Sequence, residues 1–386
     1  MAASIVGWAH TRFGRLEQDV EALIVEVTSG ALAHAGVDPG DVDAIFLSTH
    51  NGGFVHQEAP ASLVLQANPA LRFTPATRIE NACAGGSAAV HLGAQAISGG
   101  ARYVLVVGVE KMTDVSPARA QEILAAGSYL KEEAGIAGGF TGLFARVTDA
   151  YFARYGDRSA ALARIAAKNH RNGCDNPKAQ LRRDLGFDFC NTVSDRNPIV
   201  AGRIRRTDCS LVTDGAAALV LANTAAASGH ARAVRLRGVA QVNDFLPMSR
   251  RDLLAFEGPA RAWRQALDAA RITLNDLDLV ETHDCFTVAE LLQYESMGLT
   301  PPGEGAYAID EGWTERGGRL PVNVSGGLKA KGHPIGATGV SMHIMAAMQL
   351  TGEAGAMQVP GARLAGVFNM GGMAVANNAT VLEAQC

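Results

Sequence analysis

Cysteine is scarce in this chain, and its cysteines form no recognisable framework. Six occur among 386 residues, and none of them stands in a CxxC pair. A chain of this length buries a core large enough to fold without disulfides. We therefore expect free thiols in a reducing cytoplasm and no structural zinc site. The six are Cys83, Cys174, Cys190, Cys209, Cys285 and Cys386.

Long hydrophobic runs and an excess of basic charge are also missing. Three uncharged stretches approach the length of a membrane span, but glycine and polar residues interrupt each one (81–101, 332–352 and 364–382). The net charge is -4 and the pI about 6.2, whereas nucleic-acid and anionic-membrane binders concentrate lysine and arginine. We expect a globular protein with no membrane span that does not bind nucleic acid.

What the sequence does contain is an internal repeat. Residues 31–47 align without gaps over 266–282 with five identities, and 100–112 align over 361–373 with five more. Both copies follow the order helix, Asp-containing turn, apolar strand, loop, helix and buried strand. This order predicts an ancient duplication of an α/β unit, with the two copies stacked in layers.

A segment of different composition interrupts the first copy. Charged, amphipathic helical patterns fill residues 114–206, followed by Pro and Asn punctuation, and indicate an inserted subdomain lying over the first half. A buried strand at 216–221 then resumes the first half. The predicted division is 1–113 plus 207–230 for the first half, 114–206 for the insertion and 231–386 for the second half.

Cys83 is the first candidate for chemistry. It lies in the string NACAGG, where a polar turn with two glycines leads into a helical pattern. A thiol at a helix N-terminus meets free backbone N–H groups, so we expect a lowered pKa, and the glycines let a large substrate approach. On the residue alone, inert packing in an apolar segment stays open as the alternative.

Two histidine strings add further candidates. His333 lies in GGLKAKGHPIGATG, where a Gly-Pro turn presents the ring on a loop ahead of a helix. His283 and Cys285 lie in THDCFT, just after an apolar strand, and strand ends are where α/β folds place function. The alternative for this string is a strand-terminal turn with a core cysteine.

Other histidines read as structural. His91 and His343 fall inside helical patterns, where we expect satisfied core side chains. His170 with Cys174, and His283 with Cys285, lack the recurring spacing of zinc ligands, so no metal site is predicted.

Together the strings resemble the thiolase superfamily over essentially the whole chain. The matching strings are NACAGG at Cys83, GGLKAKGHPIGATG at His333 and DCSLVTDGAAALVLAN at 208–223. HDCF at 283–286 replaces the NEAF string of ordinary thiolases and is similar to the sterol-carrier-protein-type branch. The resemblance implies a five-layered αβαβα sandwich of two similar halves, an inserted loop domain that helps bind coenzyme A, and a homodimer or homotetramer.

The resemblance also implies acyl transfer between an enzyme cysteine and coenzyme A, with reversible Claisen cleavage of 3-oxoacyl-CoA in lipid metabolism. His333 takes the proton of Cys83, whose thiolate attacks the 3-oxo carbon. Cys285 is the acid in cleavage and the base in condensation, an effect of about 10²- to 10⁴-fold. His283 and His333 donate to the enolate oxygen, and the backbone N–H groups of Cys83 and Gly371 face the tetrahedral oxyanion.

The implied substrates are acyl-CoA and coenzyme A, with no metal and no further cofactor. One string departs from the ordinary pattern, in which a CxGGG string supplies a second catalytic cysteine. Here it reads NMGGM, with Asn369 at the cysteine position. An amide does not exchange a proton near neutral pH, which leaves the acid and base work to Cys285.

Three alternatives remain beside a thiolase. One is another condensing enzyme of the same fold, although such enzymes lack the paired HDCF and GHPIGATG strings. A thiolase-like aldolase needs no acyl enzyme, and Cys83 argues against it. The third is a non-catalytic acyl-CoA-binding subunit of a complex. The sequence leaves open the acyl chain length, the direction of the reaction and the residues that contact coenzyme A.

Overall fold

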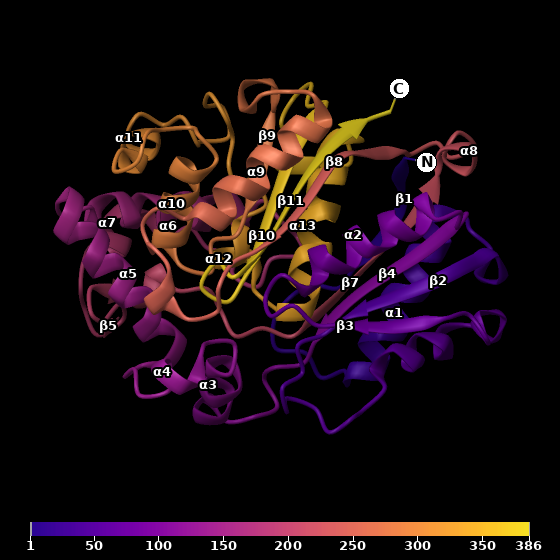
Figure 1. Ribbon diagram of the computed structural model, residues 1–386, viewed down its shortest axis with the longest axis horizontal. Helices are drawn as coiled ribbons and strands as arrows, with labels where there is room; N and C mark the ends of the chain where they lie inside the picture. Colours follow the sequence, from indigo (N-terminus) through magenta and orange to yellow (C-terminus); the bar gives the residue numbers. More distant parts are fainter. Residues whose placement is uncertain (1, 386) are drawn as a thin grey trace.

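The computed structural model describes residues 2–385, so Cys386 lies outside it. Its main sheet has nine strands in the order β3-β2-β4-β7-β1-β8-β11-β10-β9, drawn in Figure 1. The strands are β1 (Ala3–His10), β2 (Val42–Ser48), β3 (Ala76–Ile79), β4 (Tyr103–Glu110), β7 (Gly215–Asn223), β8 (Val234–Asn243), β9 (Leu279–Thr282), β10 (Leu364–Gly371) and β11 (Ala376–Ala384). A separate ribbon pairs β5 (Ile199–Ala201) with β6 (Ile204–Arg205).

The strand order shows the predicted duplication. β1 and β8 meet in the middle through a short antiparallel pairing at Ser4–Arg235 and Ile5–Val234. Outward from this seam, β7, β4 and β2 follow on one side, and β11, β10 and β9 on the other. The connections correspond as well, because β1-α1-β2-α2-β4-β7 in the first half matches β8-α9-β9-α13-β10-β11 in the second. The buried strand predicted at 216–221 lies within β7.

Helices complete five layers. α1 (Val20–Ala35) covers β1 and β7 on one outer face, and α9 (Glu257–Ala270) covers β8 and β11 on the other. α2 (Gly85–Ser98) and α13 (Ile335–Leu350) pack against each other between the two halves. Apart from Met348, every residue of α13 is buried. An added Cβ on Gly86 would lie 2.8 Å from the Gly339 nitrogen, so glycine is required for this contact. The predicted αβαβα sandwich is confirmed.

The inserted segment is helical, as predicted, but its position differs. Its helices are α3 (Pro117–Ala125), α4 (Leu130–Glu133), α5 (Gly139–Tyr155), α6 (Ser159–Cys174) and α7 (Gly186–Asn191). α6 packs on elements of the second half, namely α10 (Thr287–Ser296), α11 (Gly305–Asp310) and α12 (Gly327–Lys331), on the left of Figure 1. The expectation that the whole insertion covers the first half is therefore wrong. The physical reason is that α6 buries Leu162 and Ile165 in the same core cluster as Leu291 of α10. Lys168 of α6 also forms a buried ion pair with Glu290 of α10 at 2.6 Å. The domain boundaries themselves stay a prediction. The remaining short helix is α8 (Thr224–Ala227).

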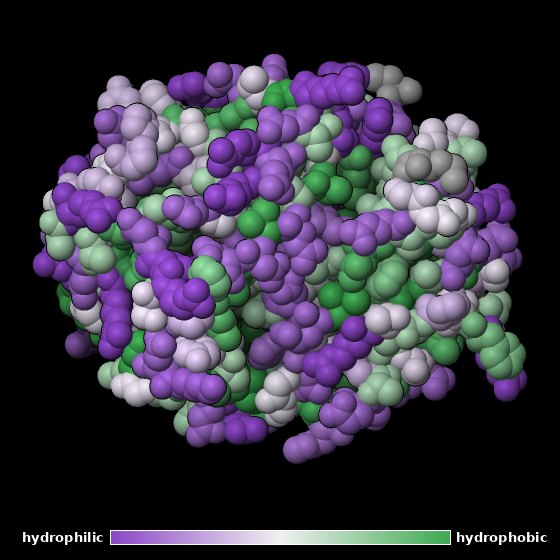
Figure 2. Space-filling model, in the orientation of Figure 1, coloured by the Kyte–Doolittle hydropathy of each residue, from purple (hydrophilic) through white to green (hydrophobic). Residues whose placement is uncertain are grey.

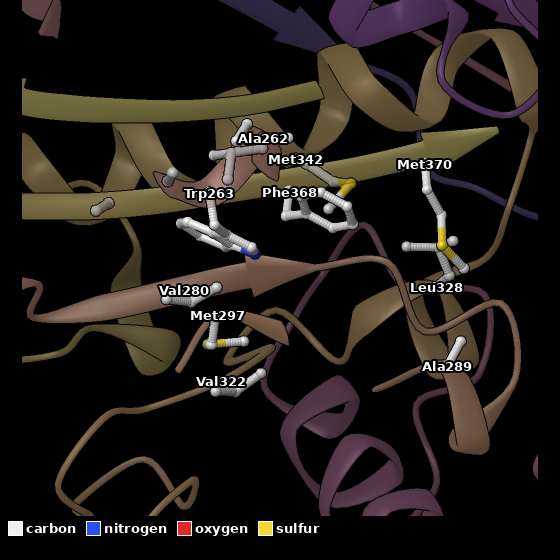
Figure 3. Packing of buried hydrophobic residues seen from close by; sticks show 14 of the residues in the cluster. Ala262, Trp263, Val280, Ala289, Met297, Val322, Leu328, Met342, Phe368 and Met370 are labelled. Carbon is white, nitrogen blue, oxygen red and sulfur yellow. The ribbon is translucent and has the colours of Figure 1, made fainter. Parts of the chain in front are cut away.

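The core of the second half packs against the strand that leads to HDCF. Trp263 of α9 stacks on Phe368 of β10, with ring centroids 5.8 Å apart and an interplanar angle of 21°. Figure 3 shows both rings above Val280 of β9, with Met342 of α13 beside them. All four side chains are essentially inaccessible to solvent. This packing gives the end of β9 a fixed position.

Outside the core, the face seen in Figure 2 is mostly hydrophilic with scattered apolar patches, as expected for a folded protein in water. None of the helices in residues 2–385 has the length and hydropathy required to cross a bilayer.

Candidate active site

Three short connections carry the four predicted catalytic side chains to one cavity. Cys83 precedes α2, His333 lies between α12 and α13, and His283 with Cys285 follows β9. All four line a cavity of about 190 Å³. The sulfur of Cys83 and a ring nitrogen of each histidine lie within 4.8 Å of one another. Residues far apart in the sequence therefore form one chemical site.

The backbone ahead of α2 bends to present Cys83. Ala82 has a φ of +46°, in the left-handed region that residues with a side chain rarely occupy. The N–H of Ala84 donates to the carbonyl of Asn81 at 3.1 Å and closes the turn. An added Cβ on Gly85 would come within 2.7 Å of Ser48 Oγ, so the helix starts close against β2. Such a strained turn is common at functional sites because the surrounding elements hold it in place.

The Cys83 thiol is neutral in the resting protein. Burial raises its pKa to about 12, and the carboxylate of Glu110 adds to the rise, whereas the backbone N–H of Gly372 opposes it. The expectation of a lowered pKa at the helix N-terminus is therefore wrong, because the loss of water and the nearby carboxylate outweigh the helix. Cys83 needs a base before it can act as a nucleophile.

His333 supplies an unprotonated nitrogen. Burial, with the charge of Lys331, lowers its pKa to about 3, so the ring is neutral. Its Nδ1 lies 2.7 Å from the hydroxyl of Thr338, which itself donates to the Pro334 carbonyl at 2.9 Å. Since that hydroxyl proton is already used, the oxygen accepts from Nδ1–H and the lone pair lies on Nε2. No group in residues 2–385 hydrogen-bonds Nε2, so it is free to take a proton.

His283 is neutral as well, because burial and the neighbouring His333 keep its pKa well below the ordinary value. Its Nδ1 lies 2.9 Å from the side-chain amide nitrogen of Asn369. The same amide nitrogen lies 3.0 Å from the backbone carbonyl oxygen of Cys83. Asn369 thus bridges the two connections that carry His283 and Cys83.

Cys285 is a second neutral thiol on the wall of the cavity. The side chain is buried, and burial raises its pKa well above the ordinary value, with the nearby Cys83 adding to the rise. Its carbonyl accepts from the N–H of Ser210 at 2.8 Å, which ties the HDCF segment to the part of the first half that follows the insertion. A neutral thiol here is a proton donor, whereas its role as acid and base stays a prediction.

Asp284, between these two residues, faces the protein rather than the cavity. Its carboxylate accepts from the N–H of Leu328 at 2.6 Å and from the amide of Asn169 at 2.7 Å. Burial, with Glu290 nearby, raises its pKa to about 7. The Asn169 amide also donates to Glu290 at 2.7 Å, so α6 and α12 together anchor the HDCF segment.

The predicted oxyanion donor Gly371 lies at the end of β10, where an added Cβ would meet the Asn81 carbonyl at 2.4 Å. Its neighbour Gly372 lines the cavity and directs its N–H to the Cys83 thiol. The oxyanion role of Gly371 stays a prediction, and Gly372 is a donor that sequence reasoning missed. Cys83, His283 and His333 also form a set that could hold a metal ion, although the chemistry expected of them calls for none.

The two histidines expected to be structural are buried in the middle layer. His91 Nε2 lies 2.8 Å from the hydroxyl of Thr380, and His343 Nε2 lies 2.9 Å from the same oxygen. That interpretation is confirmed. The remaining cavity wall was not predicted, because it comes mostly from loops and from the insertion; Cys209, Leu211 and Val212 lie in the matching string at 208–223, but that string did not indicate a cavity. The wall includes His50, Gln121, Leu124, Phe140, Thr141, Cys209, Leu211 and Val212.

Comparisons with known proteins point to one family. Residues 3–185 match the family described as thiolase, N-terminal domain, and residues 240–384 match thiolase C-terminal domain-like. Acetyl-CoA acetyltransferase of Methanothermobacter thermautotrophicus is 36% identical over 376 residues, which cover 96% of each chain. Human sterol carrier protein 2 is 33% identical over 316 residues, covering 77% of this chain and 56% of that protein.

A solved structure titled Ltp2-ChsH2(DUF35) aldolase superposes with a TM-score of 0.84 at 21% identity, covering 99% of this chain and 98% of that one. At that identity the likeness concerns the fold alone. With both halves matched to thiolase domains and an acetyl-CoA acetyltransferase aligned along nearly its whole length, this chain belongs to the thiolase family.

Proposed function

We propose that this chain is a thiolase that cleaves a 3-oxoacyl-CoA, acetoacetyl-CoA or longer, with coenzyme A, and that catalyses the reverse condensation. The observation that carries the proposal is a neutral thiol, Cys83, beside an unprotonated nitrogen of His333 in a cavity that also holds His283 and Cys285. The acetyl-CoA acetyltransferase relatives support the substrate class.

Acyl transfer begins with a proton. Nε2 of His333 accepts the proton of Cys83, and the sulfur forms a bond with the 3-oxo carbon. The bond between carbons 2 and 3 then breaks, and its electron pair passes to the acetyl-CoA enolate. Cys285 gives that enolate a proton and becomes a thiolate. His283 and the now protonated His333 are the donors for the enolate oxygen.

Coenzyme A closes the cycle. Its thiol passes a proton to the Cys285 thiolate and attacks the acyl group on Cys83. The acyl group leaves on coenzyme A, and Cys83 recovers its proton from His333. Cys83, His333, Cys285 and the two substrates account for every proton and electron pair. The reaction therefore needs no oxidant. Coenzyme A is a substrate in this proposal, and no further cofactor is called for.

Mass spectrometry after mixing with acetoacetyl-CoA tests the proposal. We expect an acetyl adduct on Cys83 and release of acetyl-CoA, and neither with Cys83→Ala. Cleavage without an adduct would instead indicate an aldolase-type reaction. Tight binding of acetoacetyl-CoA with no turnover would indicate a non-catalytic subunit of a complex. A panel of 3-oxoacyl-CoA chain lengths, compared by kcat/KM, then defines the preferred substrate.

A further inference from the structure

Asn369 stands where ordinary thiolases have their second catalytic cysteine, and the structure gives this amide two partners. Its Nδ2 lies 3.0 Å from the carbonyl oxygen of Cys83 and 2.9 Å from Nδ1 of His283. The side chain is wholly buried at the end of β10. A primary amide nitrogen carries two N–H groups, so both contacts can be made at once.

The Cys83 carbonyl fixes which way the amide points. A carbonyl oxygen only accepts, so the amide must place its nitrogen there. A flipped amide would set its own oxygen against that carbonyl and lose the hydrogen bond. Because the nitrogen is fixed, its second N–H is directed at Nδ1 of His283, which must accept. The proton of a neutral His283 ring is therefore on Nε2.

The buried oxygen of the same amide has no hydrogen-bond partner in residues 2–385. It lies against α13, where an added Cβ on Gly339 would come within 2.5 Å of it. A buried acceptor left without a partner is costly and is seldom retained without reason. The two bonds made by the nitrogen supply that reason.

We propose that Asn369 is a positioning residue that holds His283 in the Nε2–H form, as a permanent hydrogen-bond donor to the enolate oxygen. This rests on the thiolase reaction proposed above. The two histidines then have opposite tautomers. Thr338 leaves His333 with a lone pair on Nε2 to accept a proton, whereas Asn369 leaves His283 with a proton on Nε2 to donate. The Asn369 amide exchanges no proton itself, but it fixes the ring proton of His283 on Nε2.

Nitrogen-15 NMR of the histidine-labelled protein tests the tautomer directly, without any change to Asn369. The ring signals of His283 are assigned by their loss in His283→Gln. We expect Nδ1 to show the shift of an unprotonated, hydrogen-bonded nitrogen and Nε2 that of a protonated one. A proton on Nδ1 of His283 in the unaltered protein would overturn the proposal.

Asn369→Leu then tests the consequence, because leucine has a similar volume and no hydrogen bond. Its matched control is Asn378→Leu. Asn378 is the buried cross-strand partner of Asn369 on β11, and within residues 2–385 neither side-chain polar atom of Asn378 has a hydrogen-bond partner. We expect Asn369→Leu to show mixed tautomers of His283 and to lose about 10²- to 10³-fold in deuterium exchange of the acetyl-CoA methyl group. Acylation of Cys83 by an activated acetyl donor, which releases no enolate, should change far less. Asn378→Leu should keep both the tautomer and the exchange.

The outcomes separate this inference from the proposed function. If the unaltered protein forms no acyl adduct and exchanges no methyl protons, the thiolase reaction is wrong, whatever the tautomer. If it does both, but Asn369→Leu keeps the Nε2–H form or full exchange, the role of Asn369 is wrong and the reaction stands. An equal loss in acylation and exchange would indicate a merely structural role and would also overturn it.

Discussion

The rings of His283 and His333 stand nearly perpendicular, at 85°, with their centroids 5.1 Å apart. At this separation a second positive charge would be repelled, and each ring is already buried. Both are therefore neutral at pH 7, and only one can take up a proton at a time. This relationship underlies the predictions that concern the reaction.

Cys83→Ser should abolish acylation. A serine hydroxyl is far less readily ionised than a thiol, and His333 is not a strong enough base to activate it. Mass spectrometry of the protein incubated with acetoacetyl-CoA measures the adduct. Cys174→Ser, at the end of α6 and outside the cavity lining, is the matched control and should acylate normally. Turnover by Cys83→Ser near the rate of the unaltered protein would show that Cys83 is not the nucleophile.

Cys285→Ala should separate the two halves of the reaction. Cys83 should still accept an acetyl group from an activated donor, because its base is His333. Deuterium exchange of the acetyl-CoA methyl protons should fall by about 10²- to 10⁴-fold, the usual contribution of an acid or base. Undiminished exchange would assign the base to another group, even though the family assignment would stand.

Thr338→Val should slow acylation by up to about 10²-fold, at the lower end of what a general base contributes. Valine has nearly the volume of threonine but accepts no hydrogen bond, so Nδ1–H of His333 loses its partner and the ring can take the wrong tautomer. Single-turnover acylation measures the rate. Thr338→Ser keeps the hydroxyl and should restore most of it, and equal rates in the two variants would exclude this role for the hydroxyl.

Lys168→Met should destabilise the protein by about 3–5 kcal/mol, because it leaves the buried carboxylate of Glu290 without its cation. Urea denaturation gives the change in free energy of unfolding. The double change Lys168→Met with Glu290→Gln should recover part of it. Arg171, on the same helix, pairs with Glu315 at the surface, so Arg171→Met should cost less than about 1 kcal/mol. A similar loss in both single variants would contradict the prediction.

Acid should destabilise the fold below about pH 6.5. Burial lowers the folded-state pKa of seven histidines, among them His34 and His283, to about 3 for four of the others and to about 4 for His343. Below the unfolded-state value of 6.5 the unfolded chain binds more protons than the folded one, so stability falls as pH falls. Each buried histidine among them contributes about 1.4 kcal/mol per pH unit. The four histidines whose pKa is lowered to about 3 are His10, His91, His170 and His333.

Two buried carboxyl groups and His50 act in the opposite sense, because the pKa of Glu281, of Asp284 and of His50 is raised in the folded state. The seven histidines outnumber them, so the net effect should be a loss of stability. Urea denaturation between pH 7.5 and pH 5 measures it. His343→Gln should reduce the slope of unfolding free energy against pH by the equivalent of about one proton. A stability that stays level across this range would show that the histidines are not buried and neutral.

Local patterns were enough to predict the layers and the four side chains that meet in the cavity. Cys83, His333 and HDCF each lie in a string whose turn residues are visible in the sequence, and the repeat predicted the order of elements in each half. The hydroxyl of Thr338 and the N–H of Gly372 were not predicted, because nothing in the sequence shows where a neighbouring group will point.

Two of the predictions made from the sequence were wrong for the same physical reason. The pKa of Cys83 depends on burial and on Glu110. The position of α6 depends on its packing against α10 of the second half, which includes the pair of Lys168 with Glu290. Both are set by contacts between segments distant in the chain, which local propensity does not contain. Asn369 illustrates the same point, since the sequence shows that it replaces a cysteine but not which atoms it contacts.

The hydrogen bond from Asn369 to the Cys83 carbonyl joins residues 286 positions apart, across the middle layer. During synthesis the N-terminal half emerges first, with its nucleophile but without His283, His333 or the β10 strand. Contacts so distant in sequence form late in folding. The reactive thiol therefore remains without its base until nearly the whole chain has left the ribosome, so an incomplete chain cannot become acylated by this route.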